Sequence, residues 1–478
     1  MRILVTHSYF LRFDPKQWVQ RKPYPPLATL IAASILRDLG HEVAFYDTNF
    51  ASSPEEILPL LDSFQPERLV ILEDGFNYLT KMCLTNMRQA ALEMIGYARS
   101  RGIPTVHSGS DSTDHFELYL ENGAEAIILG EPEQAVTEWI RGEELEKIQG
   151  VAFLKEGKVV RNPTRPVLKD LDSLPFPAWD LLDIQPYRES WSIHGYFSIN
   201  LATTRGCPFK CNWCAKPIYG NRYNSHSAKY IVDLIEYTRK NFSFDHIWFC
   251  DDIFGLKPRW VQEFRAILQD RDIHLRYKIQ SRADLLLVED TIQALADTGC
   301  EEVWIGAESG SQRILDAMDK GTTIEQIRKS TYLMKKHGIK PCFFLQFGYL
   351  NESWEDISLT LEMIRDLRPA DIGVSVSYPL PGTGFYEKVK EQLIHKANWT
   401  DSDELLLMYQ GTFSPEFYKR LHRYVHRLFR SQQGWDAIPI VGKGEPEMRK
   451  SISWFYHYPL SWMEKARLKR ILKMESVA

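Results

Sequence analysis

The stretch Arg205-Gly206-Cys207-Pro208-Phe209-Lys210-Cys211-Asn212-Trp213-Cys214 directly follows the apolar run 198–204, where a second series of strands begins. Three thiolates on one short loop can cap three irons of a cubane cluster and leave the fourth iron without a protein ligand. A zinc site usually takes four protein ligands, and the nearest downstream histidine, His226, is twelve residues beyond the last cysteine. We therefore expect Cys207, Cys211 and Cys214 to be metal ligands. A structural zinc loop or three unpaired thiols is the alternative.

Apolar runs continue after the cysteine loop at a spacing typical of alternating strands and helices. The candidate strands are 198–204, 246–250, 276–281, 302–307, 341–348 and 372–377. Amphipathic helical patterns fill the gaps between them, for example at 228–239 and 258–269. Six βα units are two short of a closed barrel, so residues 196–395 are predicted to form a partial (β/α)6 TIM-like barrel. Its chemistry should lie at the carboxyl ends of the strands.

An earlier αβ series precedes the barrel. Its candidate strands are 2–6, 42–46, 68–72, 104–108 and 125–129. Strands that alternate with helices predict a doubly wound parallel sheet for residues 1–145, with ligands bound beyond the carboxyl ends of its strands. The fold class is thus α/β, with a proline-rich linker over 146–195 and a helical C-terminal region over 396–478. In that last region an apolar helical stripe from Phe417 to Phe429 is flanked by basic residues.

Composition sets further bounds. The 478 residues carry a net charge of −5, which gives no reason to expect a nucleic-acid partner. The N-terminus resembles no signal peptide, no apolar stretch is long enough to span a membrane, and the cysteine count is odd, so we expect a cytoplasmic protein. Cys83, Cys250, Cys300 and Cys342 do not have the spacing of a second cluster. Cys250 and Cys342 fall in apolar strands and are expected to pack as small hydrophobes.

The cysteine spacing, with Trp213 before the last cysteine, resembles the signature of the radical S-adenosylmethionine superfamily. The resemblance implies a [4Fe–4S] cluster whose open iron chelates S-adenosylmethionine and, once reduced, releases a 5′-deoxyadenosyl radical. It also implies a small-molecule substrate and an external electron donor such as a flavodoxin or ferredoxin. Trp213 is expected either beside the cluster and the adenine or as a shield against solvent.

The resemblance extends to the strand ends of the barrel. Glu308-Ser309-Gly310-Ser311 and Met318-Asp319-Lys320-Gly321 are similar to segments of cobalamin-linked members. The residues implied to bind S-adenosylmethionine are Trp213, Asp251, Asp252, Ser281, Arg282, Glu308, Gln346 and Gly348. Among them the two aspartates would meet the amine, Arg282 the carboxylate, and Gln346 and Gly348 the adenosine. The alternatives are plain loop carboxylates at 251–252, a structural ion pair at Glu308 and a tight turn at Gly348.

The first domain resembles the cobalamin-binding domain of the B12-dependent branch of this family. Its implied cobalamin contacts are Glu73, Asp74, Gly75, Ser108, Gly109, Ser110, Gly130 and Glu131. The Asp-x-His-x-x-Gly loop that often ligates cobalt is absent, and His7, which ends the first strand, is expected to be structural. The resemblance therefore implies cobalamin held without a histidine on cobalt, or a domain that has lost cobalamin.

For function, the resemblance implies methylation of an unactivated carbon. The alternative within the same class is a cobalamin-dependent oxidative cyclisation or ring rearrangement, and the alternative of another class is a non-catalytic corrinoid carrier or sensor. No catalytic residue can be named from the sequence. For the C-terminal stripe, a helix packed by one face is favoured over contact with a membrane or a lipid-like substrate.

Overall fold

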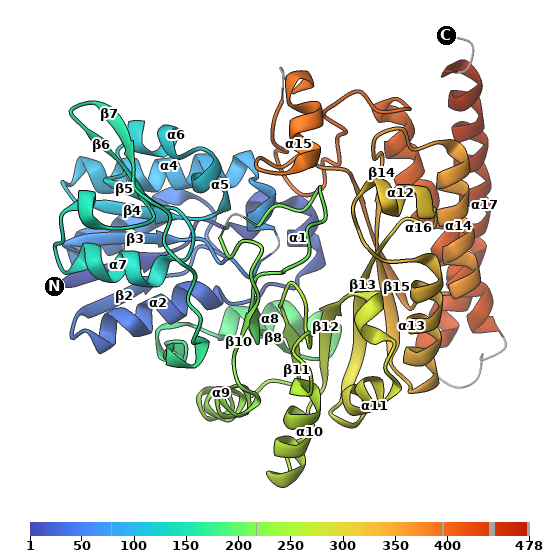
Figure 1. Cartoon of the computed structure of the whole chain (residues 1–478), viewed down its shortest axis with the longest axis horizontal. Coiled ribbons are helices and arrows are strands. Elements are labelled where there is room, and N and C mark those ends of the chain that lie inside the picture. Colours follow the sequence, from blue (N-terminus) through green and yellow to red (C-terminus); the bar gives the residue numbers. More distant parts are fainter. Residues whose placement is uncertain (78, 217, 394–395, 439–444, 476–478) are drawn as a thin grey trace.

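The computed structural model describes residues 1–478 apart from 78, 217, 394–395, 439–444 and 476–478, and it leaves the side chains of 445–450 undescribed. A parallel α/β domain and a half-barrel lie side by side, with the loops of the cysteine segment between them (Figure 1). The C-terminal helices lie against the side of the half-barrel away from the first domain. The fold class predicted from the sequence is confirmed.

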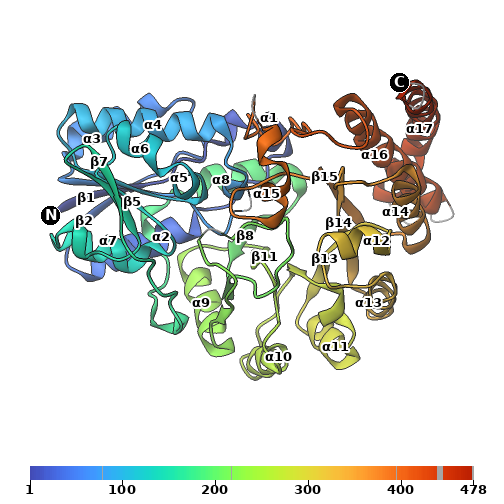
Figure 2. The ribbon, with the colours of Figure 1, turned by 45° about the horizontal axis from the view of Figure 1, so that its top comes forward.

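The N-terminal sheet has the strand order β2-β1-β3-β4-β5-β6-β7. Its strands are β1 (Arg2–Thr6), β2 (Glu42–Tyr46), β3 (Arg68–Leu72), β4 (Thr105–Ser108), β5 (Ala126–Ile128), β6 (Val151–Lys155) and β7 (Lys158–Arg161). The first five pair in parallel, as predicted. Helices α3 (Leu58–Phe64) and α4 (Thr85–Ser100) cover one face, and α2 (Leu27–Asp38) and α7 (Pro132–Ile140) cover the other (Figure 2). Shorter helices complete the domain: α1 (Pro15–Gln20), α5 (Ser110–Asp114) and α6 (Phe116–Glu121).

The first part of the predicted linker is instead a β-hairpin. Strands β6 and β7 pair antiparallel with each other, and β6 pairs antiparallel with β5. The turn uses Glu156 and Gly157, both with positive φ (51° and 75°), which is the backbone of a two-residue hairpin turn. Val151 and Phe153 are buried and Leu154 is exposed, so apolar side chains anchor the hairpin to the sheet. The linker prediction relied on the prolines from Pro163 onward, and the chain there runs through short turns and α8 (Gln185–Trp191) to the barrel.

The half-barrel has the strand order β15-β14-β13-β12-β11-β8, and neighbouring strands pair in parallel. Its strands are β8 (Ser198–Leu201), β11 (His246–Phe249), β12 (Tyr277–Ser281), β13 (Cys300–Glu308), β14 (Lys340–Phe347) and β15 (Asp371–Val376). The helices of the barrel are α9 (Ala228–Asn241), α10 (Trp260–Asp270), α11 (Glu289–Asp297), α12 (Gln312–Ala317), α13 (Ile324–Lys336) and α14 (Trp354–Leu367). The predicted strand at 198–204 ends early, and β9 (Thr204–Arg205) pairs antiparallel with β10 (Asn224–Ser225).

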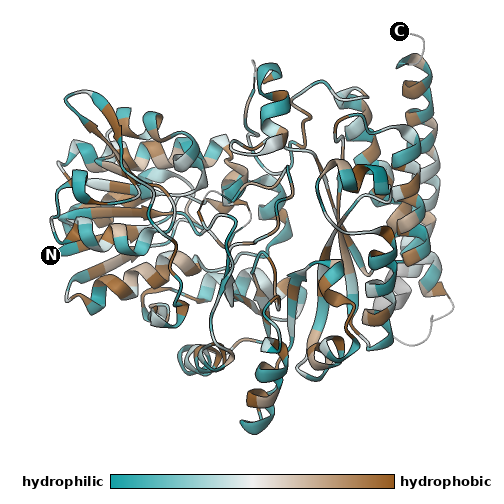
Figure 3. Cartoon of the chain, viewed as in Figure 1, coloured by the Kyte–Doolittle hydropathy of each residue, from teal (hydrophilic) through white to brown (hydrophobic). Residues whose placement is uncertain are grey.

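After α15 (Gly384–Val389) the chain returns to the first domain before the final helices begin. The Thr85 amide donates to the Trp399 carbonyl (2.9 Å), and the Ser402 hydroxyl donates to Asp14 (2.8 Å). Helices α16 (Pro415–Ala437) and α17 (Glu445–Glu475) then form a hairpin at the outer edge. The predicted stripe is confirmed in α16, where Phe417, Leu421, Tyr424, Val425 and Phe429 are buried. Apolar residues concentrate in the strands, and the outer helices alternate between polar and apolar residues (Figure 3).

Candidate functional site at the domain interface

The cysteine loop leaves β9 and returns at β10, so a small two-stranded ladder fixes both of its ends. Gly206 opens the loop with φ +79°, and a Cβ atom there would lie 2.4 Å from the Arg222 carbonyl oxygen. A side chain at position 206 would collide with backbone that cannot move independently, so the tight entry to the loop requires glycine. All three cysteines of the loop are partly buried.

The three thiols lie within electrostatic reach of one another. Burial raises the pKa of Cys214 to about 11, opposed by the nearby charges of Lys216 and Lys81, and Cys207 adds to the rise. Burial also raises the pKa of Cys207, and the charge of Cys211 contributes. Among the described residues, no three His, Cys, Asp or Glu side chains converge to hold a single metal ion. Three cysteines on one loop match the ligand set of a cluster whose fourth iron has no protein ligand, whereas a tetrahedral zinc site usually takes four protein ligands.

Arg282, at the end of β12, holds the cysteine loop from the barrel side. Its guanidinium stacks on the Phe209 ring (3.7 Å to the centroid), donates to Cys211 Sγ (3.8 Å) and donates to the Lys320 carbonyl (2.9 Å). It also pairs with Asp284 (3.0 Å). Ser281 donates to the Phe254 carbonyl (3.3 Å). The structure thus places Arg282 at the cluster loop, and its contact with a cofactor carboxylate stays a prediction.

The two segments that resemble cobalamin-linked enzymes meet beside the loop. Lys320 Nζ donates to Glu308 Oε1 (2.7 Å), and both side chains are buried. A Cβ atom at Gly306 would lie 2.4 Å from both of these atoms, so glycine leaves room for the pair. The Lys320 ammonium is 5.9 Å from the Trp213 ring, whose buried Nε1 has no hydrogen-bond partner in the described part of the chain. The resemblance assigns Glu308 to the binding of S-adenosylmethionine, with a structural ion pair as the alternative. In the structure Glu308 forms an ion pair with Lys320.

Asp251 does not face an open site. Its carboxylate accepts from the Thr203 amide (2.7 Å), the Thr203 hydroxyl (2.6 Å) and the Thr204 amide (2.7 Å). It therefore fixes the bend between β8 and β9 that leads into the cysteine loop. Burial raises the pKa of Asp251 to about 7 despite these hydrogen bonds. The predicted role for Asp251, binding the amine of the cofactor, finds no support in this geometry.

Asp252 pairs with Lys81, a residue of the first domain (Nζ···Oδ1 2.5 Å). Burial lowers the pKa of Lys81, but the charges of Asp252 and Cys214 more than offset burial, so the pKa is raised. Tyr378 from the barrel donates to the Met82 carbonyl of the same loop (2.9 Å). The loop after β3 thus reaches the barrel beside Cys214, a contact that no pattern in the sequence predicts.

Gln346 and Gly348 are closed off by protein. Gln346 donates to the Ser377 hydroxyl (2.8 Å). Gly348 has φ +82°, and a Cβ atom there would lie 3.0 Å from Leu407 and 3.4 Å from Tyr418. The structure therefore favours the tight-turn alternative at Gly348 over close approach of a cofactor.

Several predicted cobalamin contacts are occupied by structural partners. Asp74 accepts from the backbone amides of Leu27 (3.3 Å) and Ala28 (3.2 Å), so it caps α2. Glu131 pairs with Arg205 (3.1 Å), the residue two before the first cysteine, and Glu133 pairs with Arg205 as well (2.6 Å). Glu131 and Glu133 thus bind Arg205 of the barrel rather than facing a ligand, because a buried guanidinium needs counter-charges.

Two predicted glycine contacts also lie against the barrel. A Cβ atom at Gly75 would be 3.1 Å from the Tyr219 hydroxyl, and one at Gly130 would be 3.6 Å from the Ile218 carbonyl. The Arg205 guanidinium is 5.3 Å from the Tyr219 ring and 5.8 Å from the Phe76 ring. Gly75 therefore allows close packing between the domains, whereas Gly130 is favoured by its left-handed backbone (φ +99°).

The remaining edge of the sheet, after β3 and β4, keeps unsatisfied polar atoms. Glu73 Oε2 and Ser110 Oγ are buried without a hydrogen-bond partner among the described residues. Burial and the charge of Asp111 raise the pKa of Glu73 to about 8. A Cβ atom at Gly109 would lie 2.1 Å from Glu73 Oε2, and Ser108 ends β4 beside it. A cavity of about 10 Å³, roughly the space of one water, lies against Glu73 and Asp111. Orphaned polar atoms beside a glycine fit a polar ligand group, although the cavity itself has no room for a corrin ring.

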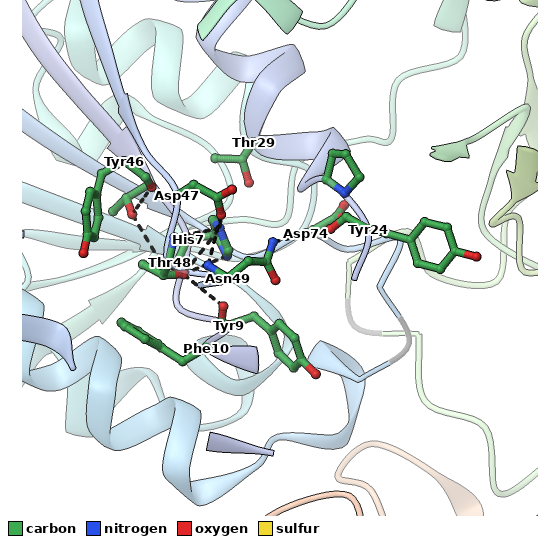
Figure 4. A network of polar contacts seen from close by, with 12 residues as sticks. His7, Tyr9, Phe10, Tyr24, Thr29, Tyr46, Asp47, Thr48, Asn49 and Asp74 are labelled. Carbon is green, nitrogen blue, oxygen red and sulfur yellow. Dashed lines mark hydrogen bonds and ion pairs between the residues drawn. The ribbon is translucent and has the colours of Figure 1, made fainter. Parts of the chain in front are cut away.

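His7 belongs to a different network, which is structural as predicted. His7 Nε2 pairs with Asp47 (2.9 Å), and Nδ1 lies 3.1 Å from the Thr48 hydroxyl (Figure 4). Tyr187, from the segment before the barrel, donates to Asp47 (2.7 Å). Burial would raise the pKa of Asp47, but the hydrogen bonds and charge of these partners hold it below its ordinary value. Both ring nitrogens of His7 are therefore engaged.

The inner face of the half-barrel carries an aromatic pair that the sequence analysis missed. The Trp304 and Phe344 rings lie 4.8 Å apart, and Phe344 is 36% exposed although it is near the middle of β14. A Cβ atom at Gly373, on the neighbouring strand, would lie 3.1 Å from Phe344. The signal for this pair was Gly373 inside the neighbouring strand β15, because strand glycines mark close approach.

Comparison with known proteins agrees with this geometry. Residues 201–364 match the family model described as Radical SAM superfamily, so this part of the chain is a radical SAM domain, of the class whose cofactors are a [4Fe–4S] cluster and S-adenosylmethionine. Within it, the chain is 27% identical over 281 residues to an uncharacterized methyltransferase (PH0819) of Pyrococcus horikoshii. It is also 27% identical over 307 residues to an anaerobic magnesium-protoporphyrin IX monomethyl ester cyclase of Rubrivivax gelatinosus. These matches cover 58% and 61% of this chain and only 60% and 54% of those proteins.

Two solved structures have a similar fold. The cobalamin-dependent S-adenosylmethionine radical enzyme OxsB, with aqua-cobalamin and S-adenosylmethionine bound, superposes with a TM-score of 0.74 over 99% of this chain and 75% of that chain, at 16% identity. The radical S-adenosylmethionine methyltransferase TsrM of Kitasatospora setae, with cobalamin and a [4Fe–4S] cluster bound, gives 0.66 over 83% and 76%, at 19% identity. At these identities the likeness shows the fold. No helix within the described residues is long and apolar enough to cross a membrane.

Proposed function

We propose that this chain is a cobalamin-dependent radical S-adenosylmethionine enzyme that methylates an unactivated carbon. One observation carries the proposal: the Lys81–Asp252 pair joins the loop after β3 of the first domain to the loop after β11 of the barrel, beside the cluster ligand Cys214. Ligands of doubly wound sheets bind at the carboxyl ends of the strands, and this loop lies at that edge. A ligand held there would lie close to the cluster loop.

The residues of the chain have distinct tasks in this proposal. Cys207, Cys211 and Cys214 hold the cluster, and Arg282 and Lys320 place positive charge beside it. When bound, the cluster and S-adenosylmethionine supply a 5′-deoxyadenosyl radical, and cobalamin supplies a transferable methyl group. The protein contributes orientation and exclusion of water.

For cobalamin, the residues after β3 and β4 are the candidates. Glu73 and Ser110 offer unsatisfied polar atoms, and Ser108 and Gly109 are small. The cavity against Glu73 and Asp111 has room for about one water, so these residues would contact a polar group of cobalamin rather than enclose its ring. The similarity in fold to two cobalamin-bound enzymes over most of this chain supports this assignment.

A cobalamin-dependent oxidative cyclisation or ring rearrangement is the second candidate. The similarity to the Rubrivivax gelatinosus cyclase favours it, and so does the Trp304–Phe344 pair, which offers a flat apolar surface to a ring substrate. A non-catalytic corrinoid carrier would need neither a cysteine loop with an open iron nor this inner face. We also propose an external electron donor such as a flavodoxin or ferredoxin, because the cluster must be reduced before each radical is formed.

The deciding experiment uses the full chain, reconstituted anaerobically with iron, sulfide and hydroxocobalamin, then reduced and given S-adenosylmethionine labelled at its methyl group. The substrates are small-molecule extracts and tetrapyrroles. Labelled product together with 5′-deoxyadenosine supports methylation, whereas substrate-dependent 5′-deoxyadenosine without label supports cyclisation or rearrangement. Bound corrinoid without any cleavage of S-adenosylmethionine supports the carrier, and reconstituted protein without corrinoid contradicts the cobalamin assignment.

A further inference from the structure

The outward face of α17 is apolar over half its length. Ser461, Glu464 and Leu468 are buried and turn toward α16, which packs extensively along α17. The exposed apolar side chains of α17 in this half are Ile452 (61%), Phe455 (70%), Tyr456 (60%), Tyr458 (42%), Trp462 (63%) and Met463 (50%). Their spacing of three, four and seven residues places most of them on one side of the helix. Proteins rarely leave so many neighbouring large apolar side chains in water without a partner.

One aromatic residue of α16 extends this surface. Trp435 is 58% exposed, and its ring lies 5.7 Å from the Trp454 ring of α17. Trp454 in turn stacks on Tyr458 (5.1 Å). We call the six exposed α17 residues together with Trp435 the aromatic face. It spans both helices at the outer edge of the molecule, on the side away from the first domain (Figure 1).

Basic residues adjoin the aromatic face. Residues 415–437 and 451–478 contain ten Lys or Arg against four Asp or Glu, although the whole chain has a net charge of −5. On α17, Lys465, Lys469 and Arg470 are exposed and directly follow Trp462 along the helix. These three form no ion pair within the described residues. The hairpin is therefore a positive region on an otherwise acidic protein.

An aromatic face next to exposed basic residues favours an anionic membrane surface as the partner. Trp and Tyr prefer the boundary between lipid headgroups and acyl chains, and neighbouring Lys and Arg are attracted to anionic headgroups. A second copy of the chain would present the same basic residues and only four acidic residues across these helices. Its charge complementarity is therefore poorer than that of an anionic bilayer. A spanning mode is excluded for α17, since no described helix is apolar enough to cross a membrane.

We propose that the aromatic face and its adjoining basic residues dock the protein on the surface of an anionic phospholipid bilayer. In this mode α17, about 46 Å long at 1.5 Å per residue, lies in the plane of the interface, and its aromatic side chains enter to a depth of about 5–10 Å. The sequence alone favours a helix packed by one face. The exposed apolar residues of α17 favour membrane contact instead.

The test is flotation of the full chain with vesicles of phosphatidylcholine alone or with about one-third phosphatidylglycerol. We expect binding to the anionic vesicles, weak binding to the neutral ones, and release as salt rises. The double variant Phe455→Ser, Trp462→Ser should bind at least about tenfold more weakly, because it loses two interfacial anchors. The double variant Lys469→Glu, Arg470→Glu should lose the preference for anionic vesicles.

The matched control is Tyr332→Ser on α13, which removes an aromatic side chain that is 66% exposed but lies outside the aromatic face. It should bind like the wild type, and all variants should keep the wild-type near-ultraviolet circular dichroism. Equal flotation with both vesicle types, or none with either, overturns the proposal. A second outcome also overturns it: the wild type is a dimer in light scattering, and Trp462→Ser makes it a monomer without changing vesicle binding. The aromatic face would then be an interface between two copies of the chain.

Discussion

Lys81, on the loop after β3 of the first domain, lies 2.5 Å from Asp252, on the loop after β11 of the barrel. The two side chains carry opposite charges beside Cys214, and the charge of each acts on that thiol. The contact therefore links the position of the first domain to the electrostatics of the cluster ligands.

Replacing Lys81 with Met should lower the reduction potential of the cluster, because the reduced cluster gains negative charge that Lys81 stabilises. Asp252→Asn should raise the potential for the opposite reason. We expect shifts on the order of 50 mV, since about 59 mV corresponds to about 1.4 kcal/mol for one electron. Redox titration followed by electron paramagnetic resonance measures both. Lys229→Met, on the exposed Lys229–Asp233 pair, is the control, and shifts of the same sign in both variants would contradict the assignment.

The buried Arg205 cluster should be important for stability. Arg205→Met leaves Glu131 and Glu133 buried without their cation, which should lower the free energy of unfolding by about 3–5 kcal/mol. Adding Glu133→Gln to Arg205→Met should recover part of the loss, because one uncompensated charge is removed. Urea unfolding followed by tryptophan fluorescence tests this. Arg276→Met, which breaks the partly exposed Arg276–Glu301 pair, should cost less than about 1 kcal/mol, and an equal loss in both variants would refute the role of burial.

Glu73 should make stability depend on pH. Its pKa is about 8 in the folded chain, raised mainly by burial, and near its ordinary value of 4.5 in the unfolded chain. Between these values the folded state binds the extra proton, so the free energy of unfolding falls as the pH rises through that range. Glu73→Gln removes this term, so the variant should gain about 1–2 kcal/mol relative to wild type between pH 5 and pH 8.5.

Urea unfolding of the cofactor-free chain at several pH values measures the Glu73 effect. Glu117→Gln, at an exposed position on α6, should leave the pH dependence unchanged. Parallel curves for wild type and Glu73→Gln would show that Glu73 titrates at its ordinary pKa in the folded state.

Cys211→Ala should abolish the cluster. We expect iron to fall from about four atoms per reconstituted chain to near zero, with loss of the visible cluster absorbance and of all S-adenosylmethionine cleavage. Cys300→Ala, at a buried cysteine away from the loop, should retain both. Iron analysis and absorbance decide, and full iron content with activity in the Cys211 variant would remove the cluster assignment.

Local patterns in the sequence predicted the parallel strands and their helices, because strand and helix periodicity involve residues close together in the chain. The three cluster ligands rest on cysteine spacing and stay a prediction. The hairpin at β6 and β7 escaped because the burial of its strands does not alternate. Val151, Ala152 and Phe153 are all buried, whereas Lys158 and Val159 are both exposed. The partners of Asp251, Asp74 and Glu131 escaped for a different reason. A carboxylate after a strand can face a ligand or a neighbouring backbone, and only the tertiary packing decides which.

Tertiary packing also explains why Lys81 was missed. It explains as well why some predicted cobalamin contacts keep polar atoms without a partner while others pack against the barrel. Glu73 and Ser110, after β3 and β4, keep polar atoms without a partner among the described residues, whereas Gly75, Gly130 and Glu131 meet the barrel. From the sequence, all of these loops looked equivalent, since each follows a parallel strand. Which of them packs on the second domain depends on the orientation of the domains, which no local pattern encodes.

The contact of Arg205 with Glu131 and Glu133 has a consequence for protein engineering. The cation belongs to the barrel, and its counter-charges belong to the first domain. A chimera that joins this barrel to the N-terminal domain of a relative would therefore need acidic residues at both equivalent positions. Without them the graft would enclose a bare guanidinium two residues from the first cluster ligand, and loss of iron would accompany the mismatch. The two halves of this protein can be exchanged only together with that trio of side chains.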